Sequence, residues 1–145
     1  MLHTLQQQYA SKPVRFFLLP CNQFGAQEPK ANSDIKTFAS GYVDLTQGNV
    51  VLLAKGNVNP PACASTAAGA CGPASDVCCP ANDGIYNYLR SVIPGAIPWN
   101  FDKFIVGKDG VPVPPALTGA QVASDVVPAI DAQLAAGADA ATTTA

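Results

Sequence analysis

Apolar side chains at the start of the chain recur at the spacing of a helix. Leu2, Leu5 and Tyr9 share one helical face, and a Lys-Pro pair ends the pattern. The run at 14–19 is rich in aromatic and branched residues and predicts a buried strand, which stops at Pro20. The chain therefore opens with a helix followed by a strand.

A second helix and a second strand are predicted further along. Asn32 or Ser33 can cap a short helix that runs to about Ser40, and Gly41 is placed to end it. The apolar run Val50–Ala54 predicts the strand that follows. The pattern so far is helix, strand, helix, strand.

The middle of the chain lacks periodicity. From Gly56 to about Asp83 the sequence consists largely of Ala, Pro, Gly, Asn and Cys, which predicts a long and poorly ordered surface excursion. Asp83 can then cap a helix with an apolar face. The residues of that face are Ile85, Tyr88, Leu89 and Val92.

The last third of the sequence predicts a hairpin and a closing helix. Residues 97–106 begin as a loop and continue as a strand, and Gly107–Gly110 supplies a hairpin turn before the short return strand 111–113. Apolar residues between 122 and 134 mark one side of a helix, in which Pro128 must lie near the first turn or distort the helix. The order of elements indicates an α/β layered domain of thioredoxin-like type, a sheet with flanking helices.

Composition indicates one globular domain and excludes some partners. The chain has 145 residues, of which 48% are hydrophobic and 12% are charged. A formal net charge of −2 with scattered basic residues argues against nucleic acid as a partner. No apolar run approaches the roughly 20 residues that span a bilayer, and the first residues lack the features of a signal peptide. Localisation is therefore unknown, with the cytoplasm as the default expectation.

The cysteines do not form a recognisable framework. Their number is odd, which argues against a complete set of disulfides, and no CxxC pair of a zinc site is present, so we expect no metal. Four of them lie in the Ala/Pro/Gly-rich excursion. The five are Cys21, Cys63, Cys71, Cys78 and Cys79.

Two blocks of sequence carry a resemblance to a known family. FLLPCNQFGAQEP at 17–29 is similar to the glutathione peroxidase signature FPCNQFGxQEP, and WNFDKFIVGKDG at 99–110 resembles that family's second signature, WNFxKFLVGxDG. The resemblance implies a glutathione-peroxidase-like domain over 1–134 with a Cys/Ala/Pro-rich insertion at about 57–83. We expect 135–145 to be a disordered tail.

The resemblance also implies the site. Carried over to this sequence, the family's catalytic residues are Gln27, Trp99 and Asn100, which surround a reactive sulfur or selenium atom. Neutral amide and indole N–H donors can stabilise a thiolate or selenolate without titrating themselves. Taken alone, Trp99 is more typical of a core or rim aromatic, and Gln27 and Asn100 are more typical of loop-capping amides. Cys21 fits a structural role better than that of a substitute nucleophile.

The residue that attacks peroxide is not recognisable in this sequence. The family places a cysteine or selenocysteine in a pattern like NVASxCG before the opening helix, and these 145 residues contain no such pattern. We therefore expect a fold that lacks the N-terminal strand or strands, and a chain that is inactive as it stands. One hypothesis is that the sequence begins at an internal Met after a selenocysteine codon, and an ordinary truncation is its rival.

The resemblance implies a peroxidase that reduces hydrogen peroxide or organic hydroperoxides during oxidative stress. Its co-substrate would be glutathione or a thioredoxin-like donor, with no bound cofactor. Cys63, Cys71, Cys78 or Cys79 can serve as resolving thiols, although an Ala/Cys-rich insertion without a role is the simpler interpretation. The short connection between 90 and 99 favours a monomer. The alternative function is a non-catalytic thioredoxin-like binding or redox-sensing module that uses the Cys63–Cys79 cluster.

Overall fold

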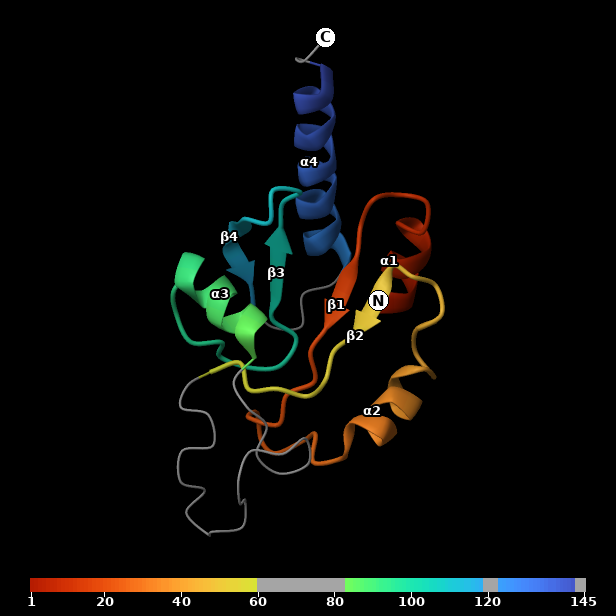
Figure 1. Ribbon diagram of the computed structural model, residues 1–145, viewed down its shortest axis with the longest axis vertical. Coiled ribbons are helices and arrows are strands. Elements are labelled where there is room, and N and C mark those ends of the chain that lie inside the picture. The colour runs from red at the N-terminus through yellow and green to blue at the C-terminus, as the bar shows by residue number, and fades with distance from the viewer. Residues whose placement is uncertain (60–82, 119–122, 143–145) are drawn as a thin grey trace. The chain divides into compact units, whose positions relative to one another are not determined.

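The computed structural model describes residues 1–59, 83–118 and 123–142 (Figure 1). The elements are, in chain order, α1 (Leu2–Gln8), β1 (Phe16–Leu18), α2 (Asn32–Ala39), β2 (Val50–Leu52), α3 (Gly84–Val92), β3 (Lys103–Val106), β4 (Pro112–Leu117) and α4 (Ala123–Thr142). They divide into two compact units, Met1–Asn87 and Tyr88–Ala145. The mixture of helices and strands confirms the predicted α/β class, with two sheets of two strands each in the described part of the chain. The expected loss of a central strand and the domain limits stay predictions.

The first unit contains a parallel pair of strands. Phe16 lies opposite Val50 and Leu18 lies opposite Leu52, with α2 in the connection between the strands (Figure 1). The backbone N–H of Leu53 donates to the Leu18 carbonyl at 2.9 Å and extends the pairing beyond β2. Parallel strands require such a crossover, which the order of the predicted elements already provided.

Both strands of this pair are shorter than the sequence predicts. The structure limits them to Phe16–Leu18 and Val50–Leu52, inside the predicted runs 14–19 and 50–54. The N–H of Val14 donates to the Lys12 carbonyl at 2.7 Å, so the chain is still turning where the first strand was expected to begin. Turn formation after the proline therefore overrides the strand propensity of Val14.

Helix α1 supplies the core of the first unit. Tyr9, at the C-cap of α1, is completely buried, and its ring centroid lies 6.2 Å from that of Phe16 in β1. Gln6 is also completely buried. Its side-chain amide donates to the Asp44 carbonyl at 2.6 Å and accepts the Asp44 N–H at 3.0 Å. The Gln6 carboxamide thus both donates to and accepts from the backbone of Asp44, as the peptide groups of a neighbouring strand would.

Helix α2 begins without the predicted side-chain cap. Its N-cap residue is Ala31, and no side chain bonds to the first-turn amides. The Asn32 Oδ1 instead accepts the backbone N–H of Lys55 at 2.8 Å, so this amide ties α2 to the chain after β2. Asp34 lies in the first turn, where a carboxylate interacts favourably with the helix dipole.

The second unit contains an antiparallel hairpin. Lys103 pairs with Leu117 and Val106 pairs with Pro112, with a register shift between Lys103 and Ile105. The turn is closed by the Gly107 N–H, which donates to the Val111 carbonyl at 2.9 Å. The hairpin turn is thus confirmed, but the return strand is longer than the predicted 111–113.

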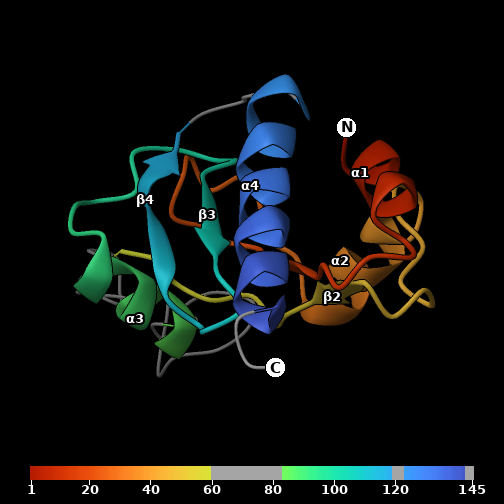
Figure 2. The same cartoon turned by 90° about the horizontal axis from the view of Figure 1, so that it is seen from above.

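Helix α4 completes the second unit as its longest helix, drawn in blue in Figure 2. Val126 and Ile130 are buried, in line with the predicted apolar side. Pro128 lies inside α4 rather than in its first turn. The sequence predicts a frayed tail from 135, whereas the helix continues to Thr142. The alanine-rich stretch favours this continuation, because alanine has a high helix propensity. No helix in the described ranges is both long and apolar enough to cross a membrane.

Candidate functional site

The first candidate residue, Gln27, follows a sharp turn in the loop after β1. Gly25 and Ala26 both adopt left-handed backbone conformations, with φ values of 64° and 51°. The Asn22 Oδ1 accepts the backbone N–H of Glu28 at 2.8 Å and closes the loop across this turn. Gln27 itself is exposed on the first unit. The Gln27 side chain is therefore exposed on a loop whose conformation is stabilised by the hydrogen bond between Asn22 and Glu28.

Gln23 anchors the other side of the same loop. Its Oε1 accepts the backbone N–H groups of Val58 and Asn59 at 2.8 and 2.9 Å. Its Nε2 donates to the Asn59 carbonyl at 2.7 Å. One carboxamide thus makes three hydrogen bonds to the chain that follows β2. Gln23 lies in the first signature, but the residue order alone indicates none of these contacts.

Lys55 forms hydrogen bonds to this loop, a role that the sequence does not predict. Its side chain is only 4% exposed, and its ammonium donates to the carbonyls of Glu28 at 3.0 Å and Lys30 at 2.6 Å. A buried ammonium needs such acceptors, because leaving water is costly for a charge. A lysine directly after an apolar strand was the available signal. Lys55 therefore holds the backbone carbonyls of Glu28 and Lys30, which follow Gln27 in the loop.

Trp99 and Asn100 are presented by a second strained turn. Phe101, the next residue, has a φ of 66°, a left-handed conformation that is an outlier for an aromatic residue. The Lys103 ammonium donates to the Phe101 carbonyl at 2.6 Å. Trp99 is 52% exposed and Asn100 is half-buried. Gln27 thus follows the left-handed residue Ala26, and Asn100 precedes the left-handed residue Phe101. A lysine ammonium bonds to a backbone carbonyl near each of these turns.

The structure places the predicted site residues in two groups. Trp99 and Asn100 are neighbours in one turn of the second unit, whereas Gln27 lies in the first unit. The meeting of Gln27 with the other two residues stays a prediction. The predicted resolving thiols Cys63, Cys71, Cys78 and Cys79 lie outside the described residues.

Cys21 is a free thiol within the first signature. Its Sγ accepts the Gln23 N–H at 3.4 Å and lies 3.6 Å from the Gln23 Oε1. Partial burial raises the pKa of the Cys21 thiol, and the hydrogen bonds from the Gln23 and Val58 backbone only partly offset this increase. A thiol with a raised pKa is mostly protonated at neutral pH and is a poor nucleophile. The structural role expected for Cys21 agrees with this environment.

The raised pKa of Cys21 leads to a testable pH dependence. In a variant with the other four cysteines changed to Ser, we expect alkylation of Cys21 by iodoacetamide to inflect at higher pH in the folded chain than in urea. The same shift makes folding less favourable as pH rises from the unfolded thiol's pKa, about 8.5, through the folded value. Equal inflections in the two states would contradict this assignment.

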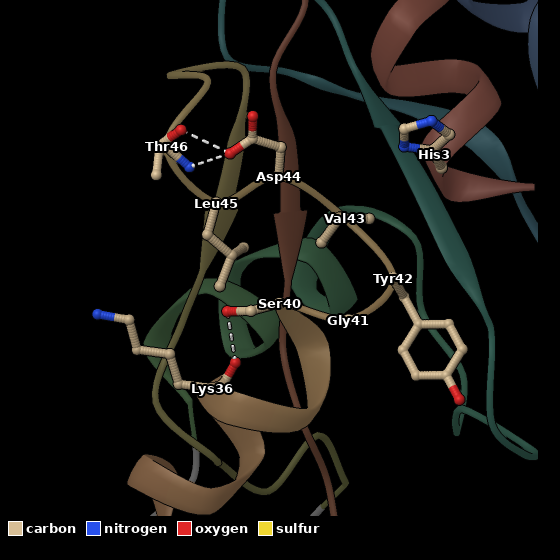
Figure 3. Close-up of a pocket in the computed structure, with 9 residues that line it drawn as sticks. All are labelled: His3, Lys36, Ser40, Gly41, Tyr42, Val43, Asp44, Leu45 and Thr46. Carbon is tan, nitrogen blue, oxygen red and sulfur yellow. Dashed lines mark hydrogen bonds between the residues drawn. The ribbon is translucent and has the colours of Figure 1, made fainter.

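A shallow pocket lies elsewhere on the first unit (Figure 3). Its lining residues are His3, Lys36, Ser40, Gly41, Tyr42, Val43, Asp44, Leu45 and Thr46. The Asp44 carboxylate accepts the hydroxyl and N–H of Thr46 at 2.6 and 2.8 Å, and these bonds lower the pKa of Asp44. The Ser40 hydroxyl donates to the Lys36 carbonyl at 2.9 Å. None of the predicted site residues lines this pocket. Among the residues that the structure describes, no group of His, Cys, Asp or Glu is arranged to hold a metal ion.

Comparison with known proteins finds a family model over the first part of the chain and relatives over most of its length. A family model of glutathione peroxidases matches residues 1–64. Phospholipid hydroperoxide glutathione peroxidase 1, chloroplastic, of Arabidopsis thaliana is 31% identical over 132 residues, which cover 86% of this chain and 47% of the relative. Glutathione peroxidase 6 of Mus musculus is 36% identical over 121 residues, which cover 77% of this chain and 52% of the relative.

The chain spans about half the length of these curated relatives. Within that span the matches extend beyond the first signature and include the second, because they cover most of the chain. The α/β class of the structure agrees with them. Taken together, these similarities show that the chain belongs to the glutathione peroxidase family.

Proposed function

We propose that the whole protein reduces hydrogen peroxide or organic hydroperoxides with a thiol donor. The observation that carries the proposal is the presentation of Gln27 and of the Trp99–Asn100 pair by two left-handed turns, each inside a family signature. Strained turns of this kind cluster at functional sites, because only a surrounding structure built for them maintains them. The relatives whose names contain phospholipid hydroperoxide support the substrate class.

The proposed chemistry needs a nucleophilic thiolate or selenolate, and the pattern that carries it in the family is not recognisable in these 145 residues. In this mechanism a thiolate or selenolate attacks one peroxide oxygen and the O–O bond breaks. The nucleophile becomes a sulfenic or selenenic acid, and the other oxygen takes a proton and leaves as water or an alcohol. One donor thiol then forms a mixed disulfide or selenenylsulfide and releases water. A second donor thiol displaces the disulfide product and restores the nucleophile.

The roles of the chain's own residues follow from their donor groups. The carboxamides of Gln27 and Asn100 and the indole N–H of Trp99 would donate hydrogen bonds to the anionic sulfur or selenium. None of the three titrates near neutral pH, so this stabilisation persists when the nucleophile is deprotonated. Glutathione or a thioredoxin-like protein would act as co-substrate, and the proposal needs no bound cofactor. A monomer suffices, because all three donors come from one chain.

The experiment compares two proteins in a peroxide-consumption assay. The first is this chain, and the second is this chain joined to the segment that its own transcript encodes upstream of Met1. We expect consumption of hydrogen peroxide or cumene hydroperoxide, with glutathione or thioredoxin as donor, only from the extended protein. In that protein, Gln27→Ala, Asn100→Ala or Trp99→Phe should each lower the rate by about 10²-fold.

A matched control is Asn87→Ala, which removes an exposed amide in α3, outside both signature blocks. It should leave the rate unchanged. A folded extended protein that consumes neither peroxide, or whose rate is insensitive to all three site substitutions, would overturn the proposal. If peroxide is not consumed while cysteines between 63 and 79 oxidise reversibly, the redox-sensing module becomes the better description.

A further inference from the structure

The turn that carries Trp99 and Asn100 is held in an unfavourable backbone conformation. Phe101 has a φ of 66° although it is not glycine. For an L-residue this region costs about 1–2 kcal/mol, because Cβ approaches the following carbonyl oxygen. The Phe101 side chain is 70% exposed, so packing of its ring offers little compensation. Another contact must therefore keep this turn in place.

Lys103 provides that contact. Its ammonium donates to the carbonyl of Phe101 at 2.6 Å, a short charge-assisted hydrogen bond to the strained residue itself. The backbone of Lys103 is paired with Leu117 at the start of β3, next to the register shift in the hairpin. The side chain thus reaches back from a fixed strand to the turn that precedes it.

The surroundings of Lys103 favour an ordered side chain over a freely moving one. The residue is half-buried, and its ammonium feels the carboxylates of Asp102 and of Asp125 in α4. Partial burial lowers the pKa of the Lys103 ammonium, while the two carboxylates oppose this decrease. A charged donor at this position is the stronger partner for a carbonyl.

We propose that Lys103 is a positioning residue, whose ammonium holds the left-handed turn at Phe101 and thereby fixes the directions of the Trp99 and Asn100 side chains. The part of this inference that concerns catalysis rests on the proposed function. The geometric part stands on the hydrogen bond and the φ angle. It assigns a role to a lysine that does not itself touch the reacting atoms.

The test uses the fact that Trp99 is the only tryptophan of the chain. Its fluorescence therefore reports on this turn without interference. Lys103→Met removes the ammonium but keeps an unbranched stem of similar volume. We expect the fast component of the Trp99 anisotropy decay to gain amplitude in this variant, because the indole moves more freely on the nanosecond scale. Lys103→Arg, which restores a charged donor, should return the decay toward that of the wild type.

The matched control is Lys108→Met, which removes an exposed lysine from the hairpin turn of the same unit. Its Trp99 decay should equal that of the wild type. A wild-type decay in a folded Lys103→Met variant would overturn the proposal. So would failure of Lys103→Arg to restore the decay while both variants keep the wild-type circular dichroism spectrum.

A second measurement needs no variant. In the ¹⁵N,¹³C-labelled wild type, a through-hydrogen-bond coupling between the Lys103 Nζ and the Phe101 carbonyl carbon is expected, and its absence would overturn the proposal. In the extended protein, Lys103→Met should lower kcat more than it changes KM, and Lys103→Arg should recover kcat. If the extended protein is inactive but the fluorescence responds, the proposed function fails while the positioning contact stands.

Discussion

Replacing Tyr9 by alanine is expected to lower the free energy of unfolding of the first unit by about 3–5 kcal/mol, the usual cost of deleting a large buried ring. Tyr9 is completely buried and contacts the Phe16 ring across the α1–β1 junction. Its loss leaves a cavity between the helix and the strand that leads to the Gln27 loop. Urea unfolding followed by circular dichroism measures the change. Hydrogen exchange of peptides within 1–59 locates it.

Two controls separate ring packing from other effects. Tyr9→Phe keeps the ring and should cost only about 1 kcal/mol, the net value of one hydrogen bond. Tyr42→Ala removes a tyrosine that is 65% exposed and whose ring centroid lies 4.9 Å from that of Phe38. Its cost should not exceed about 1 kcal/mol. Equal losses for Tyr9→Ala and Tyr42→Ala would contradict the placement of the core.

Replacing Gln23 by methionine is expected to cost about 2–4 kcal/mol. The substitution keeps the length and volume of the side chain but removes all three hydrogen bonds to Val58 and Asn59. Val58 is buried, so its N–H is left without a partner away from water, at about 1–3 kcal/mol for each such group. The measurement is again urea unfolding, with hydrogen exchange at residues 20–30 and 53–59 as the local readout.

Gln23→Glu is the matched control for this second change. A carboxylate can still accept the two N–H groups, but it cannot donate to the Asn59 carbonyl. Its stability should therefore fall between those of the wild type and Gln23→Met. A Gln23→Met variant as stable as the wild type, with unchanged protection at 53–59, would show that the three bonds do not hold the loop.

The fold was largely predictable from patterns that act locally. Helical spacing of Leu2, Leu5 and Tyr9 and the glycine-rich turn at 107–110 gave the first helix and the hairpin. The cap of α2 was not predictable, because Asn32 bonds to Lys55 rather than to its own helix. The Asn32 side chain can bond either to its own helix or to another segment, and the tertiary structure decides between these two partners. A local sequence pattern does not contain that information.

The candidate site also contains residues that the sequence predicts and residues that it does not. Resemblance located Gln27, Trp99 and Asn100, because each lies in a contiguous signature. Lys55 was missed, because its acceptors are 25 and 27 positions away along the chain. Lys103 lies in the second signature, but nothing in the residue order shows that Phe101 is left-handed. Contacts of this kind arise only from backbone geometry.

The end of the first unit has a consequence for how this chain can change during evolution. The backbone N–H of Asp83 donates to the Asn57 carbonyl at 2.9 Å, so the chain leaves at Asn57 and returns to the same place at Asp83. Closing a longer loop is inexpensive, at about 0.6 kcal/mol for each doubling of its length. The number of residues between Asn59, the last residue that Gln23 holds, and Asp83 can therefore vary while this hydrogen bond stays in place. A lineage can gain or lose sequence at this junction while both signature blocks keep their geometry.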